Sequence, residues 1–188
     1  VRGGGLMQGS LDVYSLSYGE NYYITLRWSG RRVGNGPGID FAVFENGFGY
    51  PDSGQFMDQI IVEVSVDGVE WRALPFDYLA DDESVYSTDP SLWFGFAGVS
   101  PVLYHAEDNP VDPLDPSVAG GDGFDLDALP GDDPVSSELR ENGFVYVRLV
   151  TAPSQLNPDT GLPFVRDSLS NGADIDGIIG RYLVDHTD

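Results

Sequence analysis

Apolar residues along this chain recur with the spacing of β-strands, and no long helical stripe or heptad repeat occurs. Segments rich in β-branched and aromatic residues alternate with Gly-, Pro- and Asp-rich loops, which is typical of all-β proteins. The predicted strands cover residues 11–18, 22–28, 40–46, 59–66, 69–74, 144–151 and 173–184. We therefore predict a single antiparallel β-sandwich domain over residues 1–188, with long loops between its strands.

The stretch 40–46 is too apolar to leave one face in water, so we expect a central strand of the sandwich. A turn, Gly36-Pro37-Gly38, precedes it, and its two glycines allow backbone angles closed to other residues. Asp40, Glu45 and Asn46 place polar oxygens at the two ends of this buried element. Such groups need hydrogen bonds or a cation, so the stretch is either a core strand with satisfied polar ends or part of a calcium site.

The clearest hairpin runs from residue 59 to residue 74, with Asp67-Gly68 as its predicted two-residue turn. A period of two places one set of its side chains in the core, namely Ile60, Val62, Val64 and Val66. The last predicted strand would bury Ile175, Ile178, Ile179 and Leu183.

Between these strands, residues 75–142 form a long acidic segment rich in Asp, Gly and Pro. Disordered segments seldom carry so many large apolar side chains, so we expect an ordered loop insertion. The anchoring residues are Trp93, Phe94, Phe96 and Phe124, and a short helix is expected near residues 125–129.

Composition and charge exclude several classes of partner and of chemistry. The formal net charge is −22, which repels nucleic acid and anionic membranes as partners. All basic residues are arginines and cysteine is absent, which excludes lysine Schiff-base chemistry, thiol catalysis, disulfides and thiolate metal sites. No apolar run approaches the roughly 18 residues of a membrane span, so no membrane insertion is expected.

Several segments resemble known families. Residues 64–71, with Ser-x-Asp-Gly-x-x-Trp, and residues 146–150 are similar to discoidin-type, galactose-binding-like jelly rolls. Residues 36–46, 119–126 and 173–178 resemble, in order, segments of bacterial cell-surface proteins and lipoproteins. The resemblance implies a jelly-roll sandwich, an extracellular or cell-surface address and bound Ca²⁺, but no settled activity. The chain lacks the terminal cysteine pair of discoidin domains and their apolar lipid-binding loops.

Calcium takes six to eight oxygen ligands, and a jelly roll can bring distant loops to one rim. We expect some of the following residues to converge there as metal ligands: Asp40, Glu45, Asn46, Asp122, Asp125, Asp174 and Asp176. Asp174 and Asp176, two apart on a strand, would point to the same face. The alternative is turn chemistry, in which each Asp accepts hydrogen bonds from nearby backbone amides.

The favoured function is a non-enzymatic, extracellular calcium-binding module for adhesion, with a glycan or a cell-surface protein as partner. Tyr50, Tyr78 and Trp93 lie in predicted loops and could form the rim of a ligand site. One alternative is a structural subunit of a surface layer or filament that self-assembles. Another is a glycoside hydrolase using two carboxylates such as Glu45 and Glu63, which would have to line one open cleft.

Overall fold

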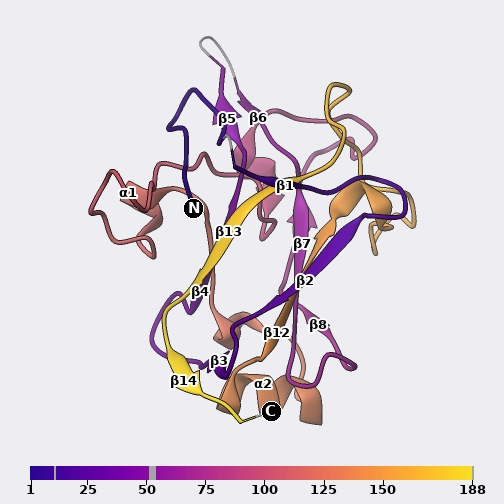
Figure 1. Ribbon diagram of the computed structural model, residues 1–188. Helices are drawn as coiled ribbons and strands as arrows, with labels where there is room; N and C mark the ends of the chain where they lie inside the picture. Colours follow the sequence, from indigo (N-terminus) through magenta and orange to yellow (C-terminus); the bar gives the residue numbers. More distant parts are fainter. Residues whose placement is uncertain (11, 51–53, 188) are drawn as a thin grey trace.

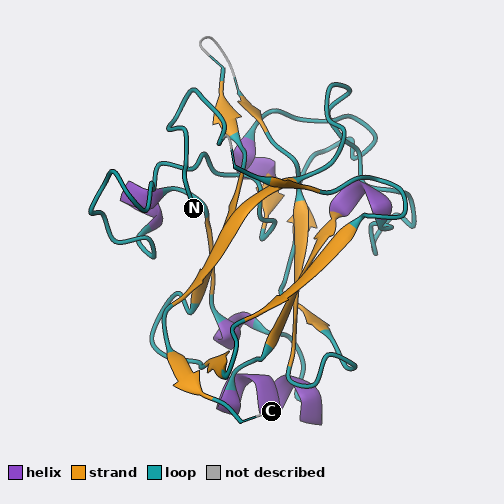
Figure 2. Cartoon of the chain, viewed as in Figure 1, coloured by secondary structure: helices purple, strands orange, loops and turns teal. Residues whose placement is uncertain are grey.

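The protein is mostly β, and two four-stranded antiparallel sheets enclose its main apolar core (Figures 1 and 2). The computed structural model describes residues 1–10, 12–50 and 54–187. One sheet has the order β1 (Tyr14–Ser15), β13 (Asp174–Gly180), β4 (Phe41–Glu45) and β11 (Asp122–Phe124). The other has the order β2 (Tyr23–Arg27), β12 (Tyr146–Thr151), β7 (Ile60–Ser65) and β8 (Arg72–Ala73). The predicted all-β class and antiparallel pairing are confirmed.

Smaller elements lie around the two sheets. Three two-stranded ribbons pair β3 (Arg31–Val33) with β14 (Leu183–Asp185), β5 (Phe48–Gly49) with β6 (Gln55–Phe56), and β9 (Asp77–Tyr78) with β10 (Trp93–Phe94). The helical pieces are η1 (Pro90–Leu92), α1 (Pro116–Ala119), η2 (Leu126–Ala128), α2 (Pro134–Asn142) and η3 (Ala152–Ser154). None of the helices in the described part of the chain has the length and apolar character needed to cross a membrane.

Strand β4 lies at the centre of its sheet and is buried on both faces, as predicted. Phe41 and Val43 point into the main core between the sheets. Ala42 and Phe44 point outward and are covered by a second cluster that includes Val102. A continuous apolar run was therefore a correct signal for a strand without a wet face.

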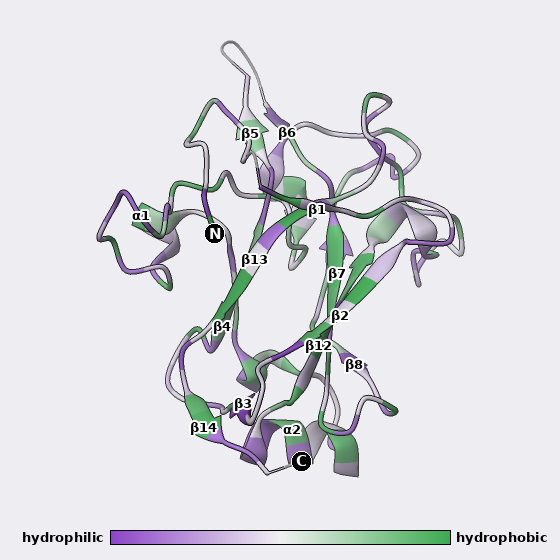
Figure 3. Ribbon diagram, viewed as in Figure 1, coloured by the Kyte–Doolittle hydropathy of each residue, from purple (hydrophilic) through white to green (hydrophobic). Residues whose placement is uncertain are grey.

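The β7–β8 hairpin forms, but its register differs from the prediction. The structure pairs Val64 with Arg72, whereas a two-residue turn at Asp67-Gly68 would pair Val64 with Trp71. The Asp67 carboxylate accepts hydrogen bonds from the backbone N–H groups of Val69 (2.8 Å) and Glu70 (2.9 Å), which widens the turn by one residue. The predicted core face of β7 is confirmed, and Figure 3 shows its apolar character.

The acidic segment 75–142 is ordered and contributes more than an insertion. Its first part, residues 75–100, packs Trp93 and Phe96 on the outer face of the β2–β12–β7–β8 sheet, in a cluster with Ile61 and Val150. Later in the segment, β11 pairs with β4 in the β1–β13–β4–β11 sheet. The predicted insertion over residues 75–142 therefore contains a strand of the sandwich itself. Phe94 was expected to be an anchor but is 57% exposed.

The predicted final strand is interrupted. Ile175 is buried, but Ile178 and Ile179 are half-buried and Leu183 is 37% exposed. The chain leaves β13 after Gly180 and forms β14 against β3 instead of continuing in the same sheet. Leu183 therefore pairs with Val33 at the end of the molecule, outside the main core.

Candidate functional site

The seven predicted metal ligands do not converge on one site. Because β4 is antiparallel to β11 and β13, Phe124 lies opposite Phe41 and Ile175 lies opposite Glu45. Asp40 and Glu45 lie at opposite ends of β4, about 16 Å apart at roughly 3.3 Å per residue. Within residues 1–10, 12–50 and 54–187, no three Asp, Glu or His side chains are grouped so that they could hold a metal ion. The seven residues are therefore divided between the two ends of β4.

At one end of β4, Asp40 is fully buried and bonded to backbone amides. Its Oδ1 accepts from Gly36 N and its Oδ2 from Leu126 N, both at 2.8 Å. Asp125 caps the short helix η2 by accepting from Asp127 N at 2.9 Å. Burial raises the pKa of Asp40, and the two amide hydrogen bonds oppose this shift. These carboxylates match the turn-chemistry alternative.

Asp122 has a similar structural role. Its Oδ2 accepts hydrogen bonds from the backbone N–H groups of Val99 (3.0 Å) and Ser100 (3.3 Å). Burial raises the pKa of Asp122 to about 6. The side chain therefore ties the end of the 75–100 segment to β11.

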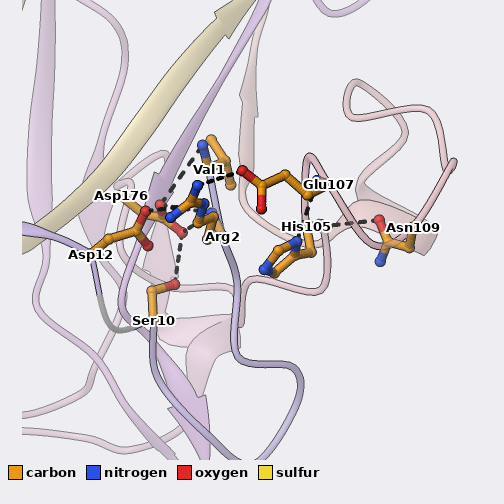
Figure 4. Close-up of polar contacts among 8 residues, drawn as sticks. All are labelled: Val1, Arg2, Ser10, Asp12, His105, Glu107, Asn109 and Asp176. Carbon is orange, nitrogen blue, oxygen red and sulfur yellow. Dashed lines mark hydrogen bonds and ion pairs between the residues drawn. The ribbon is translucent and has the colours of Figure 1, made fainter.

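Asp174 and Asp176 contact different segments. A β-bulge between Ile175 and Gly177 makes Asp176 the extra residue of β13. Its carboxylate accepts from Arg2 N (3.0 Å) and from the Ser10 hydroxyl (2.7 Å), with the Val1 ammonium 3.9 Å away (Figure 4). Asp174 instead accepts from the Ser15 hydroxyl on β1. Joint ligation of one ion by these two residues is not what the structure shows.

Glu45, at the other end of β4, is only 1% exposed and incompletely satisfied. Its Oε1 accepts from Asp174 N at 2.8 Å, but its Oε2 is buried without a hydrogen-bond partner. The neighbouring Asn46 also has a buried Oδ1 without a partner. Burial, and next the charge of Asp58, raise the pKa of Glu45 well above its usual range. Among the predicted ligands in the described residues, Glu45 and Asn46 are the two with a buried oxygen that lacks a partner.

Asp58 is a second buried acid that the sequence analysis missed. It is 5% exposed, lies two residues before β7 and accepts hydrogen bonds from the hydroxyls of Ser170 and, at 3.5 Å, Tyr18. Burial raises its pKa to about 6, and the charge of Asp174 adds to this rise. The signal was present in the sequence: Asp58 and Gln59 flank a buried strand just as Glu45 and Asn46 do.

Glu45, Asp58 and Asp174 together form what we call the Glu45 cluster. The charges of Asp58 and Asp174 raise the pKa of Glu45, and the charge of Asp174 also raises the pKa of Asp58. Among the ion pairs of the described residues none includes these three acids. Adjacent carboxylates in a buried place must either retain protons or share a cation. Oxygen donors of this kind suit Ca²⁺, and the unpartnered Oε2 of Glu45 is the atom that such an ion would satisfy.

Two of the three predicted rim residues belong to the interior. Tyr78 and Trp93 are each 2% exposed, and their rings stack at 3.7 Å between centroids. Their polar atoms bond to the backbone: Tyr78 Oη donates to Val85 O and Trp93 Nε1 to Ser87 O. Ordering of the acidic segment buries both rings, which the loop assignment did not anticipate. Tyr50 remains at the surface, 37% exposed.

The paired-carboxylate cleft does not form from Glu45 and Glu63. Glu45 is sealed inside the sandwich beside the core, whereas Glu63 lies on the outer face of the opposite sheet and bonds to Arg148. Glycosidase chemistry needs two carboxylates on one open cleft.

No family model matches this chain, and neither the curated proteins nor the solved structures that we searched contain a match. What the protein binds must therefore be inferred from its own residues.

Proposed function

We propose that this protein is a calcium-stabilised β-sandwich module that acts at the bacterial cell surface in adhesion, by binding a glycan or a surface protein. The observation that carries the calcium part is the buried Oε2 of Glu45, which lacks a partner beside Asp58 and Asp174. A carboxylate left in this state is costly, and a divalent cation bound at Glu45 Oε2 would relieve that cost.

Calcium suits the Glu45 cluster better than magnesium. Ca²⁺ accepts irregular sets of carboxylate, carbonyl, amide and water oxygens, whereas Mg²⁺ requires near-octahedral geometry and dehydrates reluctantly. The residues there offer oxygen only, since the chain has no cysteine. The formal net charge of −22 also favours uptake of cations.

The finer type of sandwich and the cell-surface address belong to the same proposal. Two four-stranded antiparallel sheets, with β1 near the N-terminus pairing with the late strand β13, are compatible with a galactose-binding-like jelly roll. The extracellular address is supported by the resemblance of residues 36–46 to surface proteins. We propose a binding role rather than catalysis.

Thermal unfolding in Ca²⁺ and after EDTA treatment tests the calcium site. Calcium at a hundred times its dissociation constant should add about 2.7 kcal/mol of stability, which is a shift of several degrees in Tm. Mg²⁺ at matched ionic strength should give a much smaller shift. Glu45→Gln should remove most of the calcium-dependent shift, because it replaces a charged ligand with a neutral amide.

Asp81→Asn is the matched control, since it removes one negative charge from an exposed loop and should leave the calcium shift intact. Elemental analysis of untreated protein covers the case of an ion that EDTA does not extract. No calcium in that analysis, together with no shift in Tm, would contradict the proposal. Equal shifts in Tm with Mg²⁺ and Ca²⁺ would show that cations stabilise the protein by general charge screening and not at a calcium-specific site.

A further inference from the structure

A second polar site lies on the outer face of the β2–β12–β7–β8 sheet, away from the Glu45 cluster. Segment 75–100 covers the Ile61 and Val150 end of this face, and the neighbouring strip is exposed or half-buried. In this strip, Thr25, Arg148, Glu63 and Ala73 form one cross-strand row. A pocket of about 310 Å³ opens over this row.

The centre of the pocket is a fixed ion pair. Arg148 Nε donates to Glu63 Oε2 at 2.5 Å, and the side chains are 27% and 22% exposed. The guanidinium carbon lies 4.3 Å from the centre of the Trp71 ring and 5.8 Å from that of Tyr23. The hydrogen bonds of the described residues include none from the two terminal amino groups of Arg148. The pair therefore presents oriented donors and an acceptor side by side.

Apolar surfaces border this polar centre. Tyr22 and Tyr23 pack edge to face at 5.0 Å between centroids, and Tyr23 keeps 43% of its surface exposed. Phe76 stands on the opposite side, and Leu156 and Pro158 close the pocket from the loop after β12. The volume is at the low end of the ~300–1,000 Å³ typical of ligand pockets, which suits one or two rings.

The charge of the pocket indicates which chemical class of ligand it can bind. Arg148 and Glu63 cancel, so the pocket has no net charge to attract an ion, and the surface with its formal charge of −22 repels anions. A wholly apolar ligand would remove the ion pair from water without replacing its hydrogen bonds. A neutral sugar offers C–H faces for the tyrosine and phenylalanine rings and hydroxyls that can both accept from Arg148 and donate to Glu63.

We propose that this pocket, formed around Tyr23, Glu63 and Arg148, binds a neutral carbohydrate. The inference takes from the proposed function only that the chain binds a ligand, and it names both the place and the chemical class. Arg148 and Glu63 orient the hydroxyls, and the exposed ring of Tyr23 stacks on the sugar. The Glu45 cluster is not part of this site.

Isothermal titration calorimetry with defined probes tests the site. The probes are cellotetraose, xylotetraose, mannotetraose and β-1,4-galactotetraose, with tetragalacturonate as the anionic counterpart. At least one neutral probe should bind with a dissociation constant below about 1 mM, and tetragalacturonate should bind at least tenfold more weakly. Tyr23→Ala should weaken binding tenfold or more, whereas Tyr23→Phe, which keeps the ring, should bind nearly as the wild type does.

Tyr14→Ala is the matched control, because Tyr14 is 52% exposed on β1 in the other sheet. Arg148→Lys keeps the charge but loses the planar fork and should also weaken binding. The proposal fails if no neutral probe binds, if Tyr23→Ala and Tyr14→Ala bind equally, or if tetragalacturonate binds best. It also fails if sedimentation shows a dimer that Tyr23→Ala dissociates, since the face would then join two copies.

Titrations run in both Ca²⁺ and EDTA separate this inference from the calcium proposal. If no sugar binds but the calcium-dependent shift in Tm is intact, only the carbohydrate site is overturned. Sugar binding without any calcium effect overturns only the calcium site.

Discussion

Individual carboxylates in this chain have two different roles that their sequence contexts do not distinguish. Asp40 and Glu45 flank the same strand and are both buried. Asp40 accepts two backbone hydrogen bonds, whereas Glu45 accepts one and leaves Oε2 without a partner. The difference arises because Leu126 and Gly36 approach Asp40 through chain folding, which no local pattern in the sequence reveals.

Asp40→Ala should destabilise the protein by about 2–5 kcal/mol, because it leaves two buried N–H groups without acceptors at roughly 1–3 kcal/mol each. Asp40→Asn keeps one acceptor oxygen and should cost less. Urea unfolding measures both losses, which should be the same in Ca²⁺ and in EDTA. Loss of the calcium shift in Asp40→Ala would instead place the ion at this end of β4.

Of the two glycines expected to use unusual backbone angles, Gly36 and Gly38, one does so. Gly38 has a positive φ of 79°, as the sequence predicted for a residue with unusual backbone angles. Gly36 does not have a positive φ; a Cβ there would lie 2.5 Å from the ring of Tyr182. The site requires glycine because the ring of Tyr182, almost 150 residues away in the sequence, packs against it. The turn pattern identified the position of this glycine but not the cause.

At the scale of elements, strand patterns predicted most of the sandwich, and the omissions have physical causes. Apolar periodicity identified β2, β4, β7 and β12, whose side chains form the core. It missed α2 because that helix is mostly polar and is capped by Asp133, which belongs to an acidic loop. Two acids of the Glu45 cluster, Glu45 and Asp174, were among the predicted metal ligands. Asp58 was not, since it was assigned to a loop.

The contact between segment 75–100 and β7 depends on Gly98. Its φ is +78°, and a Cβ would lie 2.1 Å from the carbonyl oxygen of Asp58. Gly98→Ala should therefore cost more than about 3 kcal/mol, which is the range of severe single substitutions. Gly161→Ala is the matched control, since Gly161 has φ +69° with open space around it and should cost about 1–2 kcal/mol.

Urea midpoints of the two glycine variants give the comparison. A larger loss for Gly98→Ala measures the close approach of the segment to β7, because both variants carry the same left-handed strain. Equal losses would mean that residues 75–100 do not pack on the sheet. The pocket around Arg148 would then lose the wall that contains Phe76.

For the whole molecule, the acidic composition is important in two separate ways. Surface acids repel one another, and salt screens this repulsion over a Debye length of about 8–10 Å at moderate ionic strength. Buried acids are screened much less, and the sequence alone could not count them. Among the described residues, four carboxylates have pKa values raised by burial: Asp40, Glu45, Asp58 and Asp122.

These raised pKa values predict how stability changes with pH in the absence of calcium. Between the unfolded pKa near 4 and the folded value of about 6 for Asp58 and Asp122, the folded state holds more protons than the unfolded state. Stability in EDTA should therefore fall as pH rises from 5 to 7.5, with Asp58 alone contributing roughly 1.4 kcal/mol over this range. High salt should reduce the surface contribution but leave this fall in place.

Calcium should reverse the trend, because an ion bound by Glu45 and Asp58 replaces their protons. The increase in Tm on adding Ca²⁺ should grow between pH 5 and pH 7.5, and Glu45→Gln should abolish that growth. Asp122→Asn separates the two effects: Asp122 bonds to Val99 and Ser100, outside the Glu45 cluster, so its replacement should reduce the pH dependence in EDTA without changing the calcium increment. A calcium increment that is constant with pH would show that the ion, if bound, competes with no buried proton and lies outside the Glu45 cluster.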